Sequence, residues 1–289
     1  MPKRKAAFAP TFCIFVSLIF VSLALPIATG CARRYRVDGL LLAVDRPRQA
    51  ITVSHRTIPG FMNAMAMPFR VRDAREMENL SPGARIGFRL TVEKDASYID
   101  RLRIRKADLD DDDLPLPKPS ETVAIGEPVP DFTLTDQAGA RTRLSDFQGK
   151  VLAVNFIYTR CPLPEVCPRL SANFSRLQRR FREQLGKDLI LLSVTIDPRY
   201  DAPEVLSGYA KIWKADPRGW RFLTGDLASV ESVARRFGMV YWPEEGLLTH
   251  TSQTGVIARD GTLAALVEGS GYLVNQLGDL IAAQLEASR

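Results

Sequence analysis

The segment that most constrains the fold is one that cannot belong to a folded core. Residues 108–113 read Asp-Leu-Asp-Asp-Asp-Asp, and prolines follow at positions 115, 117 and 119. An acidic run before spaced prolines is typical of a solvated, semi-extended linker, which we place at residues 107–124. These carboxylates would ligate a hard cation only if the backbone held them in place. The chain of 289 residues, 46% of them hydrophobic, is therefore expected to fold on each side of this linker.

The first 30 residues have the layout of an export signal. A basic cluster, Lys3-Arg4-Lys5, precedes an apolar stretch over residues 6–27 and the small residues Ala28-Thr29-Gly30. With Cys31 these small residues resemble a bacterial lipobox, although Ala28 stands where that motif usually has Leu. The resemblance implies lipidation of Cys31. Ordinary signal cleavage and an uncleaved membrane anchor are the alternatives. We expect a signal peptide at 1–30 and a membrane-attached protein on the periplasmic face of a bacterial envelope.

The net charge of +6 does not indicate a nucleic-acid partner. Of the 39 lysines and arginines, three lie in the export signal, which leaves 36 basic residues against 33 acidic ones. These residues are scattered along the chain, whereas nucleic-acid binding needs a concentrated basic surface. We therefore expect no nucleic-acid partner.

Residues 35–106 alternate between apolar and polar positions like short strands separated by turns. Five such strands in about seventy residues favour a small all-β barrel. The expected strands are Val37–Ala43, Ala50–His55, Phe69–Arg72, Arg85–Val92 and Tyr98–Ile104.

Residues 125–289 instead alternate strands with amphipathic helices, which predicts a central sheet covered on both faces. A hairpin-like stretch over 132–144 comes first. The expected strands are 151–158, 189–196 and 220–223, and the expected helices are 170–185, 203–213, 227–237 and one from about 273; a further hairpin turns at Asp260-Gly261.

Only two of the four cysteines belong to the expected mature fold. Cys13 and Cys31 lie in the signal region, whereas Cys161 and Cys167 follow an apolar strand and precede a helix. In an oxidising compartment two nearby thiols form a disulfide by default. Amide donors at the strand-to-helix junction favour the thiolate, which makes such cysteines reactive.

The residues around this pair resemble the Sco/SenC family of copper proteins, whose fold is thioredoxin-like. The resemblance rests on Pro130-Asp131-Phe132, on residues 155–162, on Thr195-Ile196-Asp197-Pro198 and on Thr249-His250-Thr251-Ser252. It implies copper ligation by Cys161, Cys167 and His250. Independently, two thiolates and an imidazole suit Cu(I) and can also hold Cu(II). Asp197 is either a neighbour that supports the site or a turn residue.

The spacing of the cysteines departs from this family. Five residues separate them here, including Pro162 and Pro164, whereas the family usually has three. Thioredoxin-type reductases have two intervening residues, and a peroxiredoxin-type reaction would leave the second thiol and His250 without a role. The longer spacing still permits both thiols to bind one metal ion.

Methionines cluster upstream, in residues 61–69. Met65 and Met67 are two residues apart, so on a strand their thioethers lie on one face. Methionines that fill the core of a small barrel are the alternative. With His55 just upstream, the segment resembles CusF-like copper-binding domains, barrels of the OB type. The resemblance implies a second site for Cu(I) at His55, Met65 and Met67, with Met62 near the place where CusF has a capping tryptophan.

Together these features predict an α/β thioredoxin-like domain at 125–289, preceded by a small all-β OB-type barrel at 35–106. The predicted function is a copper metallochaperone. The Sco resemblance implies, as recipient, the copper subunit of cytochrome c oxidase with its binuclear centre, and other copper chaperones are expected partners. Two alternatives stay open: a thiol-disulfide reductase that uses Cys161 and Cys167, and a copper-tolerance protein that sequesters the metal.

Overall fold

The computed structural model describes residues 32–93, 96–105, 121–244 and 247–287. From Ala32 onward the chain forms one compact unit. The expected signal peptide at 1–30, the expected lipidation site Cys31 and most of the expected linker lie outside the described residues. Within the described ranges, no helix has both the length and the apolar character needed to cross a bilayer.

The N-terminal domain is an antiparallel sheet of five strands in the order β3-β2-β1-β4-β5. Its core includes Leu41, Val53 and Phe88, from alternating positions of three strands. The strands are β1 (Arg33–Asp45), β2 (Ala50–His55), β3 (Met65–Arg70), β4 (Arg85–Val92) and β5 (Ser97–Ile104), with a short 3-10 helix at Ala74–Met77.

Two details of this domain differ from the prediction. The third strand begins four residues early, at Met65, so that Met65 and Met67 are paired strand residues. The sheet is also not closed: its two edges meet only through an isolated bridge between Val71 and Ile99. The predicted all-β domain is confirmed, but its barrel is an open sheet.

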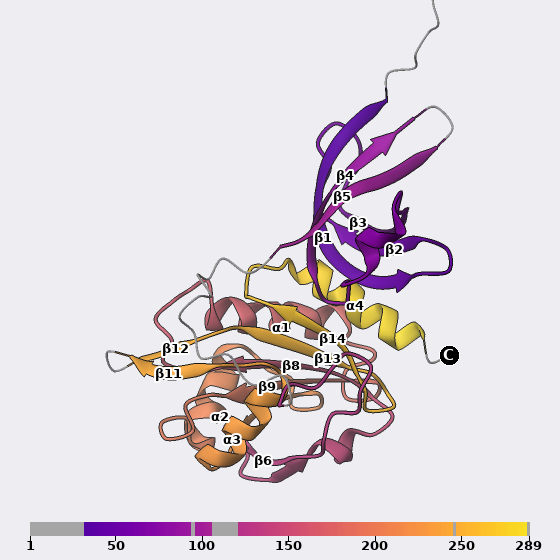
Figure 1. Ribbon diagram of the computed structural model, residues 1–289. Coiled ribbons are helices and arrows are strands. Elements are labelled where there is room, and N and C mark those ends of the chain that lie inside the picture. Colours follow the sequence, from indigo (N-terminus) through magenta and orange to yellow (C-terminus); the bar gives the residue numbers. More distant parts are fainter. Residues whose placement is uncertain (1–31, 94–95, 106–120, 245–246, 288–289) are drawn as a thin grey trace, which may run out of the picture. The chain divides into compact units, whose positions relative to one another are not determined.

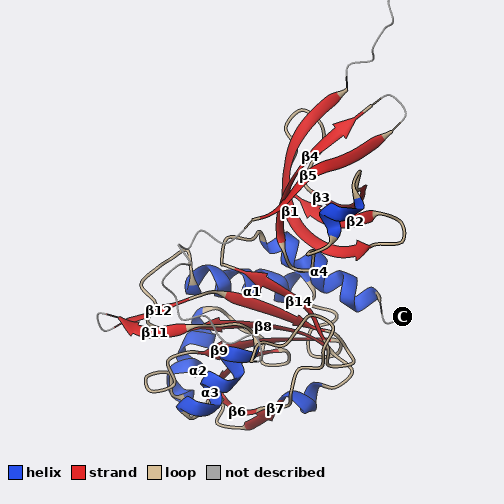
Figure 2. Ribbon diagram, viewed as in Figure 1, coloured by secondary structure: helices blue, strands red, loops and turns tan. Residues whose placement is uncertain are grey.

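The C-terminal domain has a seven-stranded sheet in the order β14-β13-β8-β9-β10-β6-β7. Helices α1 and α4 cover one face and α2 and α3 the other (Figures 1 and 2). The strands are β6 (Thr133–Asp136), β7 (Arg141–Arg143), β8 (Val151–Ile157), β9 (Leu189–Thr195), β10 (Trp220–Thr224), β13 (Gln253–Ile257) and β14 (Leu263–Glu268). The helices are α1 (Cys167–Arg180), α2 (Pro203–Ile212), α3 (Leu227–Arg236) and α4 (Val274–Glu286), with a 3-10 turn at Leu144–Phe147.

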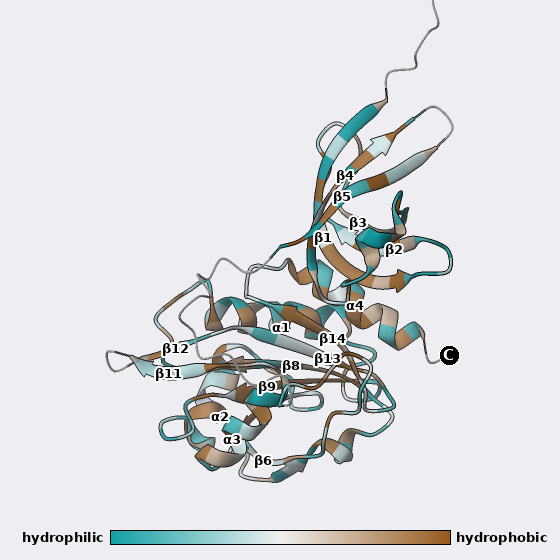
Figure 3. Ribbon diagram, viewed as in Figure 1, coloured by the Kyte–Doolittle hydropathy of each residue, from teal (hydrophilic) through white to brown (hydrophobic). Residues whose placement is uncertain are grey.

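The central strands explain this layered arrangement. Every residue of β8 and of β9 is buried, and the two strands pair in parallel. Strands buried on both faces need helices above and below them. The helices carry hydrophobic and hydrophilic residues, brown and teal in Figure 3, as expected when one side of each helix faces the sheet.

Two elements near the cysteines were not predicted correctly. Helix α1 begins at Cys167 rather than near residue 170, because Pro168 suits the first turn, where no amide donor is needed. A separate hairpin, β11 (Tyr241–Glu244) and β12 (Leu247–His250), carries His250 at its end. This hairpin and the start of α1 define where the candidate ligands lie.

A buried carboxylate joins the ends of β8 and β9. Asp201 is fully buried and accepts hydrogen bonds from the Thr159 amide (3.1 Å), the Thr159 hydroxyl and the Thr195 hydroxyl. Burial raises the pKa of Asp201. Thr159 opens the loop that holds Cys161, so Asp201 fixes the start of that loop.

We predict that Asp201→Ala lowers the free energy of unfolding by about 2–5 kcal/mol, because it leaves two hydroxyls and an amide without their acceptor. The raised pKa gives the pH dependence. The contribution of Asp201 is complete below its unfolded pKa of about 4 and declines as pH rises through the folded pKa. Asp201→Asn should remove this decline. Urea unfolding between about pH 4 and pH 8 measures both effects.

The matched control is Asp260→Asn. Hydrogen bonds from Thr262 lower the pKa of the exposed Asp260, so its contribution is lost as pH falls, with the opposite sign. An unchanged pH slope in Asp201→Asn would contradict the role assigned to Asp201.

Candidate metal centre

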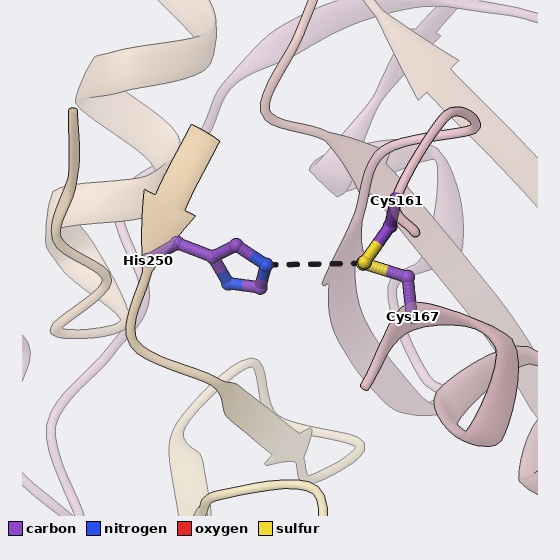
Figure 4. Close-up of side chains that lie close together, drawn as sticks. All are labelled: Cys161, Cys167 and His250. Atoms are coloured by element: carbon purple, nitrogen blue, oxygen red, sulfur yellow. Dashed lines mark hydrogen bonds between the residues drawn. The ribbon is translucent and has the colours of Figure 1, made fainter. Parts of the chain in front are cut away.

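Three of the predicted ligands lie together in the structure. The sulfurs of Cys161 and Cys167 and a ring nitrogen of His250 all lie within 4.8 Å of one another. Cys161 comes from the loop after β8, Cys167 is the first residue of α1, and His250 ends β12 (Figure 4). Residues from three separate parts of the sequence thus present soft donor atoms to a single point.

The two cysteines are free thiols with different surroundings. Cys161 is half-buried, whereas Cys167 is fully buried at the N-terminus of α1. A hydrogen bond from Cys167 lowers the pKa of Cys161 to about 4, although partial burial opposes this effect. The same hydrogen bond and burial raise the pKa of Cys167. The coupling therefore favours the thiolate on the more exposed Cys161 over the buried Cys167.

The histidine is oriented by its own backbone. Nδ1 of His250 lies 2.6 Å from the carbonyl oxygen of Thr251, which can only accept a hydrogen bond. We therefore assign the proton to Nδ1, which leaves the lone pair on Nε2. That atom lies 3.9 Å from Sγ of Cys167. Metal-binding histidines are commonly held in this way through the nitrogen that does not bind the metal.

Tyr158 connects the cysteine strand to the histidine hairpin. Its hydroxyl donates to the carbonyl of Leu248 (3.3 Å), and its ring meets the His250 ring edge to face, with centroids 5.7 Å apart. Burial raises the pKa of Tyr158, so its hydroxyl keeps its proton and remains a donor. Tyr158 thus holds β12 against the end of β8.

The five-residue spacing is accommodated in the loop. The amide of Val166 donates to the carbonyl of Leu163 (3.1 Å), which forms a turn between the two cysteines. Residues 162–165 are exposed, and the side chain of Leu163 is 51% exposed. The longer loop therefore bulges toward solvent while the two sulfurs stay together.

Asp197 lies beside the site but engages a different group. Its carboxylate pairs with Arg160 at 2.7 Å, and the guanidinium of Arg160 lies over the ring of Tyr200. The sequence indicated neither Asp201 nor Tyr158 as a supporting residue. Asp201 follows Asp197 by four residues, but a carboxylate in a polar turn gives no sequence signal that it is buried.

The second predicted set lies in the N-terminal sheet. His55 and Met65 are directly paired across β2 and β3, and Met67 is two residues further along the same face. His55 is buried and Met65 is half-exposed. Met67 and Met62 are partly buried, and Met62 lies in the turn that bridges back to Ile58.

His55 is held in the same way as His250. Its Nδ1 lies 2.7 Å from the carbonyl oxygen of Arg56, so Nδ1 carries the proton. Its Nε2 is buried and has no hydrogen-bond partner within the described residues. A buried nitrogen with a free lone pair is costly unless it binds something. Together with adjacent thioethers, this nitrogen fits a soft cation.

Comparison with known proteins agrees with both halves of the chain. The SCO1/SenC family model matches residues 121–281, more than half of the chain, and the model described as copper binding periplasmic protein CusF matches residues 34–104. The SCO1 protein homologue of Bacillus subtilis is 29% identical over 134 residues, 45% of this chain and 68% of that protein. The mitochondrial SCO1 homologue of Homo sapiens is 31% identical over 146 residues, 47% of each chain.

Among solved structures, a SCO1/SenC family lipoprotein from Bacillus anthracis is similar, with a TM-score of 0.50 and 26% identity. The similarity covers 56% of this chain and 100% of that one. The prediction of a thioredoxin-like α/β domain after a small all-β domain is confirmed. The chain belongs to the SCO1/SenC family and carries an N-terminal CusF-like segment.

Proposed function

We propose that this protein is a copper metallochaperone with two separate copper sites, whose cargo is copper itself. The observation that carries the proposal is the convergence of the Cys161 and Cys167 sulfurs on Nε2 of His250. Thiolate and imidazole donors prefer copper and other soft or borderline cations over hard ones. Family membership and the CusF-like segment support copper as the cargo.

The thioredoxin-like site binds copper only when both cysteines are reduced. The lowered pKa of Cys161 favours its thiolate, and Cys167, whose pKa is raised, must release its proton when the metal binds. Copper loading therefore depends on the redox state of the pair. We propose that this site holds Cu(I) and also accepts Cu(II).

The second site, at His55, Met65 and Met67 with Met62 as a further thioether, binds Cu(I). The partnerless Nε2 of His55 supports it. Thioethers need no deprotonation and cannot form a disulfide, so this site stays competent when the cysteines are oxidised.

We propose the remaining assignments from the family. The recipient is the binuclear copper centre of the cytochrome c oxidase copper subunit, and other copper chaperones supply the metal. The chain is organised as signal peptide 1–30, all-β domain 35–106, linker 107–124 and thioredoxin-like domain 125–289. It is attached to the membrane at the periplasmic face through Cys31 or an N-terminal anchor. The CusF-like segment and the similar lipoprotein support this location.

The free thiol pair also favours a second function, reduction of the disulfide in the recipient. The lowered pKa of Cys161 favours its thiolate, which is the nucleophilic form in disulfide exchange. Disulfide exchange needs the two cysteines but not His250, so the histidine separates the two functions.

We predict that His250→Ala weakens Cu(I) binding at the cysteine site by at least about tenfold, because one of three ligands is lost. The rate of reduction of a small disulfide should stay within about twofold of the original rate. Competition with a chromophoric Cu(I) chelator measures the affinity in the reduced protein, in a His55→Ala background that removes the second site. Unchanged Cu(I) affinity would refute ligation by His250 and favour the reductase.

We predict that the reduced protein binds two Cu(I) ions and that Cys161→Ser with Cys167→Ser leaves one. In this double variant, His55→Ala should abolish binding, and Met65→Leu should weaken it by about tenfold. Met77→Leu is the matched control, because Met77 is a buried core methionine of the same domain. Equal effects of Met65→Leu and Met77→Leu would mean that the methionines only fill the core.

A further inference from the structure

The N-terminal domain holds the basic surplus of the mature chain. Its described residues between 33 and 105 include 14 arginines and seven acidic residues, whereas residues 121–289 include 19 basic and 20 acidic residues. An arginine surplus of this size gives a small domain a positive surface potential that attracts anions. Attraction is strongest where several arginines lie close together without acidic partners.

Three of these arginines line one pocket of about 240 Å³, which is formed by residues of β1 and β4 and by the residues that follow β2 and β5. We call it the arginine pocket. Its charged lining is three guanidinium groups and a single carboxylate. The lining residues are Asp38, Gly39, Arg56, Arg85, Ile86, Arg105 and Gln276.

Backbone pairing sets the positions of the three arginines. Arg56 directly follows β2, and its amide donates to the carbonyl of Asp38 in β1 (3.0 Å). Arg85 opens β4, and its carbonyl accepts from the amide of Arg105, just after β5 (2.7 Å). The ends of neighbouring strands therefore direct three cationic residues to one place through the sheet itself.

The pocket does not neutralise its own charge. Arg105 pairs with Asp38 at 2.9 Å, but both side chains are more than half exposed. Arg56 donates only a long hydrogen bond, 3.4 Å, to the carbonyl of Gly271. Among the described residues, Arg85 has no ion pair and its guanidinium has no acceptor. Guanidinium groups repel one another when they gather in this way, and an anion between them removes the repulsion.

Two glycines bring the backbone close to the charged side chains. A Cβ atom at Gly87 would lie 2.8 Å from Nε of Arg105 and 2.9 Å from Oδ1 of Asp38, so these side chains would have to shift to admit it. A Cβ atom at Gly271 would lie 3.4 Å from Nη1 of Arg85, an ordinary van der Waals contact. The side chains of Arg105 and Arg85 therefore pack against backbone at these two positions.

We propose that the arginine pocket binds a phosphate group. Guanidinium groups match phosphate oxygens with paired donors, and a phosphate supplies the negative charge that the lining lacks. The group comes either from free phosphate or from an anionic phospholipid headgroup, and the two share this chemistry. The site is also next to the second copper site, because the carbonyl that holds the His55 ring belongs to Arg56.

The test is calorimetric titration of the compact unit from Ala32 onward, without copper, in low-salt buffer that contains no phosphate. Inorganic phosphate is one titrant, and a soluble short-chain phosphatidylglycerol is the other. We expect saturable binding of at least one titrant at one site. Arg85→Gln and Arg56→Gln should each weaken it by about tenfold, because each removes a charge-assisted contact. Asp38→Asn should strengthen binding, because it removes the competing carboxylate.

The matched control is Arg176→Gln, which removes the same charge from an exposed position of α1 and should leave the affinity unchanged. Tighter binding of the lipid would assign the pocket to a headgroup, and equal or tighter binding of inorganic phosphate would assign it to free phosphate.

The proposal would be overturned if neither inorganic phosphate nor the phosphatidylglycerol showed saturable binding. An equal loss of affinity in Arg176→Gln would also overturn it, because the effect would then be one of net charge. Circular dichroism checks the fold of each variant. Arg56→Gln carries the test if Arg85→Gln does not fold, since the Arg56 side chain is exposed. Copper plays no part in the titration, so its outcome is independent of the proposed copper function.

Discussion

The candidate metal centre depends on how the chain leaves the buried strand β8. All seven residues of β8 are buried. The next four residues include Tyr158, Thr159 and Cys161, which therefore lie at the C-terminal end of this central strand. Asp201 holds Thr159 from the side of β9, and Tyr158 reaches the hairpin that carries His250. The loop with the reactive thiols is thus fixed at its start by contacts that no metal supplies. A candidate site assembled in this way is pre-organised before any metal ion binds.

The only two histidines of the chain are oriented by the same device. In both, Nδ1 donates to the carbonyl of the following residue, which leaves the lone pair on Nε2. In His250 this atom lies 3.9 Å from Sγ of Cys167, and in His55 it is buried without a hydrogen-bond partner among the described residues. The two proposed sites differ in the chemistry of their sulfur ligands, which are thiols in one and thioethers in the other. Cys161 and Cys167 can be oxidised and must lose protons to bind metal, whereas Met65 needs neither reduction nor deprotonation. On this basis oxidation closes one site and leaves the other open.

Sequence reasoning recovered what depends on local pattern. The apolar run at 151–157 and the strands and helices expected after it predicted the layered domain. A strand that is buried on both faces appears in the sequence as a run of consecutive apolar residues, which can be recognised directly. The hairpin that carries His250 was missed, since Pro243 and the acidic residues that follow it in the sequence indicate a loop. Asp201 and Tyr158 were missed because their partners lie in other elements. The arginine pocket was missed because the charge was summed over all residues after position 30, which cancels the surplus of one domain against the acids of the remainder.

The longer spacing between the two cysteines changes the exposed loop between them and leaves the two sulfurs close together. Helix α1 begins at Cys167, so the extra length lies wholly in residues 162–166 and does not shift the buried thiol relative to the helix. The turn at Leu163 takes up the added residues, and the two sulfurs still meet His250. The exposed Leu163 and its flanking prolines therefore change the surface beside the metal centre while the ligand set is kept.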